Sequence, residues 1–215
     1  MCESRIMRTI KEAESIVGTL SKPDKMPCYS YSIPAWFCKI GMKMRKVIGS
    51  ICSKCYALKG HYVFPNVKAA QEKRFHSLID PRWVSVMTFL IQRKEKSGFF
   101  RWHDAGDLQD SSHLQNIITI AENLPEINFW LPTREYNIVN EYIRKNGREP
   151  ENLTVRLSSL MFDGDVTKRQ NPFDLPTSGA SKEGFNCPSS KQGNKCLDCR
   201  ACWDKAIPNI IYKEH

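Results

Sequence analysis

Eight of the nine cysteines fall into two groups, one toward each end of the 215-residue chain. Unpaired cysteines that recur at short spacings are more often metal ligands than disulfide partners in a chain long enough to bury its own core. The predicted ligands are Cys28, Cys38, Cys52 and Cys55 in the first group, and Cys187, Cys196, Cys199 and Cys202 in the second. Each group supplies four thiolates, the number that a structural zinc ion or a [4Fe–4S] cluster takes. Cys2 is left over and receives no role.

The spacing within each group does not decide between zinc and a [4Fe–4S] cluster. In the second group Cys196, Cys199 and Cys202 form a CxxCxxC run with Cys187 at a distance, which is at least as typical of a [4Fe–4S] cluster as of zinc. In the first group only Cys52 and Cys55 have CxxC spacing, and the alternative that Cys28 or Cys38 is simply buried stays open.

Polar residues follow three strands that the sequence predicts. The candidates are His103, Asp104 and Asp107 after the first strand, Arg134 and Glu135 after the second, and Ser158 and Ser159 after the third. The carboxyl ends of parallel strands share one edge of a sheet, where α/β proteins place their chemistry. Asp104 and Asp107 could therefore act as nucleophile and acid/base, with His103 beside them. The alternative is that Asp107 caps the next helix and His103 packs against the sheet.

The remaining candidates predict substrate binding. Arg134 suits a phosphate or carboxylate, unless it only pairs with Glu135 at the surface. Aromatic rings that either stack on bases or fill the core are those of Trp36, Trp102, Trp130, Tyr29, Tyr31 and Tyr56.

The middle of the chain alternates helical and strand-like patterns. Helices are expected over residues 66–79, 81–96, 111 or 112 to 123, and 135–146, and strands over 99–103, 127–131 and 153–157. This alternation predicts an α/β fold with a parallel sheet forming a partial or complete (β/α) barrel.

We expect a single α/β domain over 1–215. It comprises a cysteine-rich N-terminal segment (1–65), a βα core (66–162) and a C-terminal metal-binding segment (163–215). The two outer segments lack a clear apolar pattern, and metal binding can organise such chain.

Charge and composition bear on partners and location. The formal net charge of +9 favours a polyanionic partner, and we expect nucleic acid, DNA more than RNA. No apolar run is long enough to span a membrane and no signal peptide pattern is present, so we expect a cytoplasmic protein with no membrane partner. The sequence leaves the oligomeric state open.

Four motifs together resemble a bacteriophage family named for gene product 88. They are Ser32-Ile33-Pro34-Ala35, the CSKCYALKG stretch at 52–60, the FRWHDAGD stretch at 100–107, and the CxxCxxCW stretch at 196–203. The resemblance covers most of the chain from about Cys28 onward. It implies a phage or prophage source, and therefore the cytoplasm of an infected cell, and it implies no reaction.

Two enzyme classes are similar in part. tRNA-guanine transglycosylases use two aspartates at barrel strand ends and a zinc site near the C-terminus, roles that the resemblance would give to Asp104, Asp107 and the second cysteine group. The chain departs from their zinc pattern and is much shorter. Radical SAM enzymes carry iron–sulfur clusters on partial α/β barrels, but their CxxxCxxC signature is missing because position 48 is Ile48. Only a variant loop using Cys38, Cys52 and Cys55 would fit, with one iron open to S-adenosylmethionine.

Three functions follow as hypotheses. The first is a phage enzyme that exchanges nucleic-acid bases, such as a 7-deazaguanine-inserting transglycosylase, through Asp104 and Asp107. The second is an iron–sulfur enzyme of the radical SAM type. The third is a nucleic-acid-binding or host-interaction module whose metals are structural.

Overall fold

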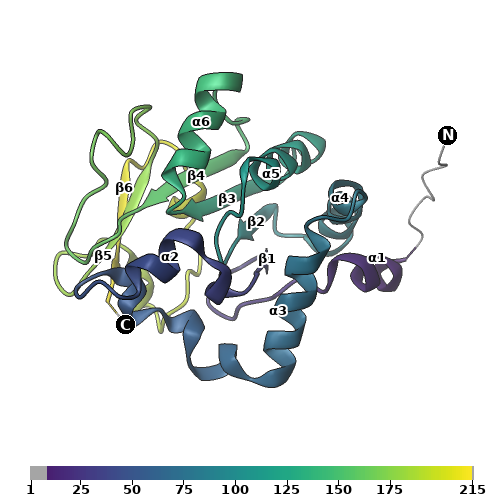
Figure 1. The fold of residues 1–215 in the computed structure, drawn as a ribbon, viewed down its shortest axis with the longest axis horizontal. Helices are drawn as coiled ribbons and strands as arrows, with labels where there is room; N and C mark the ends of the chain where they lie inside the picture. Colours follow the sequence, from purple (N-terminus) through teal and green to yellow (C-terminus); the bar gives the residue numbers. More distant parts are fainter. Residues whose placement is uncertain (1–8, 215) are drawn as a thin grey trace.

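The computed structural model describes residues 9–214 and contains helices on one side of a β-sheet (Figure 1). The α-helices are α1 (Ile10–Val17), α2 (Lys39–Met44), α3 (Pro65–Ser77), α4 (Trp83–Lys94), α5 (Ser111–Asn123) and α6 (Tyr136–Asn146). The strands are β1 (Tyr29–Tyr31), β2 (Phe99–Trp102), β3 (Asn128–Thr133), β4 (Leu153–Ser158), β5 (Thr177–Ser181) and β6 (Asn209–Lys213). Short 3₁₀ turns fill the cysteine-rich parts, among them η2 (Ile51–Lys54), η5 (Pro188–Lys191) and η6 (Ala201–Trp203).

The sheet is parallel throughout, and its spatial order β1-β2-β3-β4-β5-β6 is also the order along the chain. Right-handed crossovers that always step in one direction leave their helices on the same face of the sheet. Figure 1 shows α4, α5 and α6 side by side along that face. The predicted α/β class with a parallel sheet is confirmed. The sheet is open, with β1 and β6 at its edges, so its strands do not close into a complete barrel.

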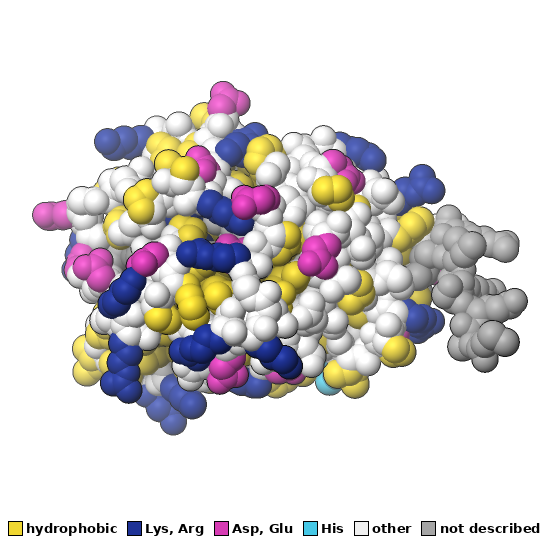
Figure 2. All heavy atoms as spheres, turned by 90° about the horizontal axis from the view of Figure 1, so that it is seen from above, with side chains coloured by type: hydrophobic (Ala, Val, Ile, Leu, Met, Phe, Trp, Pro, Cys, Tyr) yellow, Lys and Arg dark blue, Asp and Glu magenta, His cyan; other side chains and the backbone are white. Residues whose placement is uncertain are grey.

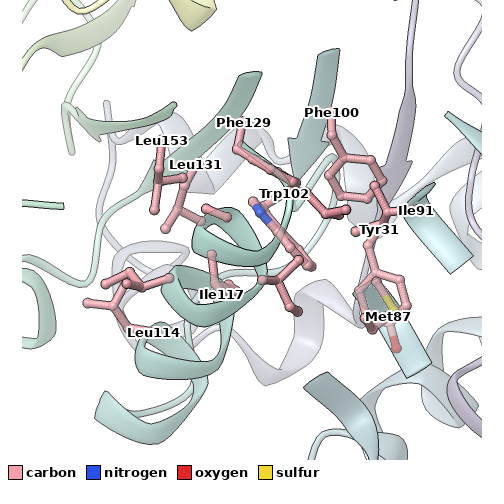
Figure 3. Packing of buried hydrophobic residues seen from close by; sticks show 14 of the residues in the cluster. Tyr31, Met87, Ile91, Phe100, Trp102, Leu114, Ile117, Phe129, Leu131 and Leu153 are labelled. Atoms are coloured by element: carbon pink, nitrogen blue, oxygen red, sulfur yellow. The ribbon is translucent and has the colours of Figure 1, made fainter. Parts of the chain in front are cut away.

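The helix face of the sheet carries the main apolar core. Alternate strand residues point to it, because side chains in a strand alternate between the two faces. Figure 3 shows Trp102 among Phe100, Phe129 and Leu131, with Ile117 of α5 packed close by. The apolar faces predicted for residues 81–96 and 111–123 are the ones that α4 and α5 use here. The helix predicted over 66–79 is present as α3, but the residues that it buries are polar: Gln71, Arg74 and Ser77.

The opposite face, which we call the inner face, is covered by the chain between β5 and β6. The Arg156 side chain on this face is fully buried and donates to the backbone oxygens of Thr177, Ala201, Asp204 and Ile207. The four carbonyl oxygens bind its two terminal nitrogens, while its Nε has no partner among the described residues. A buried guanidinium is costly to leave without such partners.

Trp203 fastens the same segment at a second point. Its indole Nε1 donates to the Phe100 oxygen at 2.8 Å, and its own carbonyl accepts from Thr154 Oγ1 at 2.7 Å. The segment between β5 and β6 is therefore tied to β2 and β4 by polar contacts as well as by apolar packing.

Strands from all three predicted segments join the one sheet. β1 comes from residues 1–65, while β5 and β6 come from 163–215. These three strands were not expected: β1 has three residues, and β5, with the sequence TSGAS, has little of the apolar pattern that signals a strand. No helix in the described part of the chain is long and apolar enough to cross a lipid bilayer.

The start of α5 differs from the expectation that Ser111 or Ser112 caps it. The cap is Asp110, whose Oδ1 accepts from the His113 backbone nitrogen at 2.8 Å. We expect Asp110→Ala to lower the free energy of unfolding by about 1 kcal/mol, because the first turn loses its acceptor. Ser112→Ala is the matched control and should change it by less than about 0.5 kcal/mol. Urea unfolding of both variants checks this, and equal effects would show that Asp110 is not the cap.

Candidate functional site

The loops after β2, β3 and β4 meet at the carboxyl edge of the sheet, as the sequence predicted. Asp107 joins the first two: its Oδ1 accepts from Thr133 Oγ1 at 2.6 Å, and its Oδ2 from the Arg134 backbone nitrogen at 2.9 Å. Arg134 joins the third, because its Nε donates to the Ser159 oxygen at 2.9 Å. Ser158 supports this edge from β4 through a 3.1 Å contact between its hydroxyl and that of Ser178.

Asp107 is an anchor and is poorly placed to be a nucleophile. Its Oδ1 also accepts from the Leu108 backbone nitrogen at 2.8 Å, so both carboxylate oxygens are occupied by donors of the protein. The residue is 6% exposed, and burial raises the pKa of its carboxyl while the hydrogen bond from Thr133 opposes that rise. It does not cap α5, the alternative that the sequence left open.

Asp104 is held differently. Ser30 Oγ donates to its Oδ1 at 2.7 Å, and the Tyr62 hydroxyl donates to its Oδ2 at 3.2 Å. The Tyr56 hydroxyl donates to the Asp104 backbone oxygen. The loop that carries Asp104 needs glycine two residues later, because Gly106 has φ +86° and a Cβ there would lie 2.7 Å from the Ile33 oxygen.

A pocket of about 350 Å³ opens beside Asp104. Its polar lining includes Tyr62, Gln71 and Arg74. The Gln71 side chain is almost fully buried, and its Oε1 has no hydrogen-bond partner among the described residues. A buried acceptor without a partner is a group that a bound molecule could satisfy.

Three cysteines of the first group border this edge. The charges of Cys38 and Cys52 both interact with that of Cys55 and with Asp107 and Arg134. A Cβ placed on Gly41 would lie 3.7 Å from the sulfurs of Cys38 and Cys52 alike, so both thiols face the same space. Burial raises the pKa of both thiols, and a metal would have to displace their protons to bind.

Glu135 fixes the position of the segment that carries Cys38. Its Oε1 accepts from the Ile40 backbone nitrogen at 2.9 Å, in the first turn of α2 directly after Cys38. A carboxylate at a helix N-terminus is favourable, and this one ties the loop after β3 to the cysteine loop. Glu135 is therefore a positioning residue, and no ion pair with Arg134 is seen between residues 9 and 214.

Cys28 does not join the first group, which corrects the predicted grouping. It precedes β1 at the amino edge of the sheet, and it packs with Met26, Trp130 and Trp203 near Cys196. Burial raises the pKa of the Cys28 thiol to about 12, with a further contribution from Glu95. The first group is thus three cysteines, Cys38, Cys52 and Cys55.

All eight predicted ligands are free thiols, and the second group, Cys187, Cys196, Cys199 and Cys202, gathers near the amino edge of the inner face. Across residues 9–214 no three His, Cys, Asp or Glu side chains lie close enough to share one metal ion. Metal binding by these cysteines stays a prediction. Cys2 lies outside the described residues.

His103 and Trp102 lie away from the edge, contrary to the roles predicted for them. Trp102 is fully buried on the helix face, so it is a core residue and offers no stacking surface. His103, at φ 55°, turns its ring into the same core, 5.2 Å from the ring of His113. Neither imidazole has a hydrogen-bond partner in the described chain.

Sequence reasoning missed Ser30, Tyr62 and Gly41. Ser30 and Tyr62 bind Asp104, and Gly41 leaves room between two cysteines. Only the nearness of Gly41 to Cys38 in the sequence was a usable signal, because β1 and the turns around Tyr62 have no clear periodic pattern.

The geometry defines a class: an α/β protein with an open, sequentially ordered parallel sheet and cysteine clusters at opposite edges. The family model described as Gene product 88 matches residues 6–205, and the chain belongs to that family. This confirms the resemblance carried by the four motifs. A search of curated proteins and a search of solved structures found no significant match.

Because His103 and His113 are buried, we expect the free energy of unfolding to fall in acid. Burial lowers the pKa of His113 to about 4 and that of His103 well below its usual range. Below pH 6.5 the unfolded chain takes up protons that the folded chain refuses, so stability falls from about pH 6.5 toward pH 4, by about 1.4 kcal/mol per pH unit for each group. Urea unfolding at several pH values measures this.

The variant His113→Leu isolates one of the two groups. It should flatten the pH dependence by about half, since His103 alone then titrates. A stability that is constant between pH 6.5 and 4.5 in the unmodified protein would contradict the account.

Proposed function

We propose that this chain is an iron–sulfur enzyme of the radical SAM type, which binds a [4Fe–4S] cluster through Cys38, Cys52 and Cys55. The observation that carries the proposal is the number of thiols at the carboxyl edge. Cys38, Cys52 and Cys55 border that edge, whereas Cys28 lies at the other edge. Three protein ligands leave one iron of such a cluster open to S-adenosylmethionine.

The residues present fit this group better than they fit zinc. Structural zinc is held by four protein ligands in a tetrahedron, and the first group offers three thiols. Gly41 keeps clear the space that the Cys38 and Cys52 sulfurs border. The open sheet with its helices on one face supports the same proposal, since radical SAM enzymes place their cluster on a partial α/β barrel.

A bound cluster would supply an electron to S-adenosylmethionine and so initiate radical chemistry on a substrate. Residues of the chain position the loops around the proposed cluster. Asp107 and Glu135 fix the loops, and Arg134 keeps both terminal guanidinium nitrogens without a hydrogen-bond partner among residues 9–214. A free guanidinium fork suits a carboxylate, such as that of S-adenosylmethionine.

The substrate in this proposal occupies the pocket beside Asp104. A volume of about 350 Å³ lies in the range of small-molecule sites, and Asp104, Tyr62 and Gln71 offer it polar partners. Asp104 then acts as a substrate-positioning acceptor. The transglycosylase alternative is less well supported, because Asp107, its second carboxylate, has both oxygens occupied.

Nucleic acid is the substrate class we propose. No Asp or Glu occurs between Asp24 and Glu72, a stretch that we call the basic segment. Its exposed cations are Lys39, Lys43, Arg45, Lys46, Lys54, Lys59 and Lys68. The same segment carries the three cysteines, so exposed positive charge lies near the proposed site, where Lys54 is paired with Glu214. The face seen from above in Figure 2 mixes both signs of charge. A positive field attracts phosphate backbones.

Anaerobic reconstitution tests the cluster. We expect the triple variant of Cys38, Cys52 and Cys55 to alanine to lose about four irons per chain relative to the unmodified protein. Addition of S-adenosylmethionine to the reduced, unmodified protein should change the electron paramagnetic resonance signal of the cluster and yield 5′-deoxyadenosine. Gly41→Ala should bind less iron at this site, since its Cβ would lie 2.8 Å from that of Cys38.

Two results would overturn the cluster proposal. One is an unchanged iron content in the triple variant, and the other is a reduced cluster that ignores S-adenosylmethionine. If Asp104→Asn abolished base exchange by a protein without iron, the transglycosylase alternative would replace it.

Salt dependence of binding tests the substrate class. Changing Lys43, Arg45 and Lys46 together to alanine should weaken DNA or RNA binding and flatten its dependence on salt, because each lost phosphate contact lowers the slope by about 0.9 for a duplex. The matched control changes Lys11, Lys96 and Lys145, which are exposed outside the basic segment. Equal losses in the two triple variants would show that the basic segment has no special role.

A further inference from the structure

The second cysteine group surrounds a hollow. A cavity of about 170 Å³ is bordered by Cys187, Cys199 and Cys202. Its other walls are mostly apolar, from Pro188, Ala201, Ile207 and Ile210. The fourth cysteine, Cys196, stands beside them, since its charge interacts with those of Cys187 and Cys199. Three thiols thus line one partly open space, and the fourth lies near two of them.

The size of the space argues for a group of several atoms. One water molecule takes up about 30 Å³ in the liquid, so the hollow is several times larger than a single small ligand. A zinc ion is gripped by its sulfurs at about 2.3 Å and leaves no such space between them. A cluster fits, because each thiolate bonds a different iron at the corners of a larger body.

The backbone on both sides of Cys196 contains residues with positive φ. Leu197 has φ 44°, a left-handed conformation that a leucine rarely adopts, and Asn194 has φ 62°, a conformation that asparagine tolerates. The Cys199 nitrogen donates to the Cys196 oxygen at 2.9 Å, which closes a tight turn. Turns of this kind aim backbone N–H groups at one point and recur at iron–sulfur sites.

Cations stand around the same thiols. The charges of Arg101 and Arg156, on the inner face, favour the thiolate form of Cys202. Those of Lys25 and Arg101 favour the thiolate form of Cys196. Among these, Arg156 is fully buried. The Tyr212 hydroxyl lies 3.4 Å from the Cys202 sulfur. Four thiolates bring negative charge, and buried cations and hydrogen bonds to sulfur offset it and tune a cluster's potential.

We infer that Cys187, Cys196, Cys199 and Cys202 bind a second [4Fe–4S] cluster, one whose irons all have protein ligands. It lies at the amino edge of the inner face, whereas the proposed first cluster lies at the carboxyl edge. Cys28 packs in the same cluster as Cys196 and Cys202, and we do not assign it as a ligand because it does not line the hollow. Closed coordination leaves no iron for S-adenosylmethionine, so this cluster holds the segment between β5 and β6 and serves as a redox centre. The inference goes beyond the proposed function and does not depend on it.

Arg101 connects the two ends of the inner face. Its guanidinium lies 4.5 Å from the centre of the Trp130 ring and interacts with Asp104 on one side and with Cys202 on the other. Its buried Nε has no hydrogen-bond partner within residues 9–214. The charge of Arg101 therefore interacts both with a ligand of the proposed second cluster and with the loop of the candidate substrate pocket.

Iron analysis of matched variants tests the inference. The triple alanine variant of Cys38, Cys52 and Cys55 lacks the first site and should still bind about four irons and about four sulfides. The double variant Cys196→Ala with Cys199→Ala should lose about four irons and keep the response to S-adenosylmethionine. Cys28→Ser is the control and should bind as much iron as the unmodified protein.

Several outcomes would overturn it. They are about one zinc and no iron in the triple variant, an unchanged iron content in the Cys196 and Cys199 double variant, and an iron loss in Cys28→Ser as large as in that double variant. If the double variant does not fold, Cys202→Ser replaces it, because an oxygen ligand should shift the reduction potential of a cluster at this site and leave a zinc protein without one. Retention of iron by the triple variant would support the second cluster even if S-adenosylmethionine had no effect on the first.

Discussion

The buried carboxylate of Asp107 is the contact on which the carboxyl edge of the sheet depends. It binds the hydroxyl of Thr133 and the backbone nitrogens of Leu108 and Arg134, so the loops after β2 and β3 cannot separate without stranding a buried charge. Arg134 extends the connection to β4 through the Ser159 oxygen. Glu135 then holds α2, and with it Cys38. The three-cysteine site therefore inherits its position from the sheet.

The inner face is held together by polar contacts, whereas the helix face is held together by apolar packing. Arg156 binds four carbonyl oxygens, three of them in the segment that carries the second cysteine group. Arg101 lies over Trp130 between the two edges. Buried cations on one face and cysteines at each edge suit the sheet to hold negatively charged groups. The proposed cluster that binds S-adenosylmethionine lies at the carboxyl edge, and the proposed fully ligated cluster lies at the amino edge.

The sequence predicted the helix face well and the inner face poorly, for a physical reason. Residues 99–102, 128–133 and 153–158 bury one side against helices, so their apolar pattern is strong. β1, β5 and β6 depend on neighbouring strands and on contacts such as Ser178 with Ser158, which no local pattern reports. Polar residues at strand ends were predicted to meet, and Asp107, Arg134 and Ser159 do.

The grouping of the cysteines could not be predicted from spacing alone. Cys28 is close to Cys38 in the sequence, but β1 runs between them and carries them to opposite edges. In the same way Trp102 and His103 adjoin Asp104 in the chain, yet their side chains enter the core. Trp102 does so because alternate residues of β2 face the helices, and His103 does so because its φ of 55° turns the chain just after the strand ends. Spacing identified the cysteine-rich segments, and strand geometry decided which cysteines meet.

Mössbauer spectroscopy of iron-57-reconstituted protein, with and without S-adenosylmethionine, distinguishes a cluster with an open iron from a fully ligated one. We expect two clusters, of which one has a single iron whose signal shifts when S-adenosylmethionine binds, while the other is unaffected. Spectra in which no iron responds, or a folded protein that takes up zinc and no iron, would contradict this expectation.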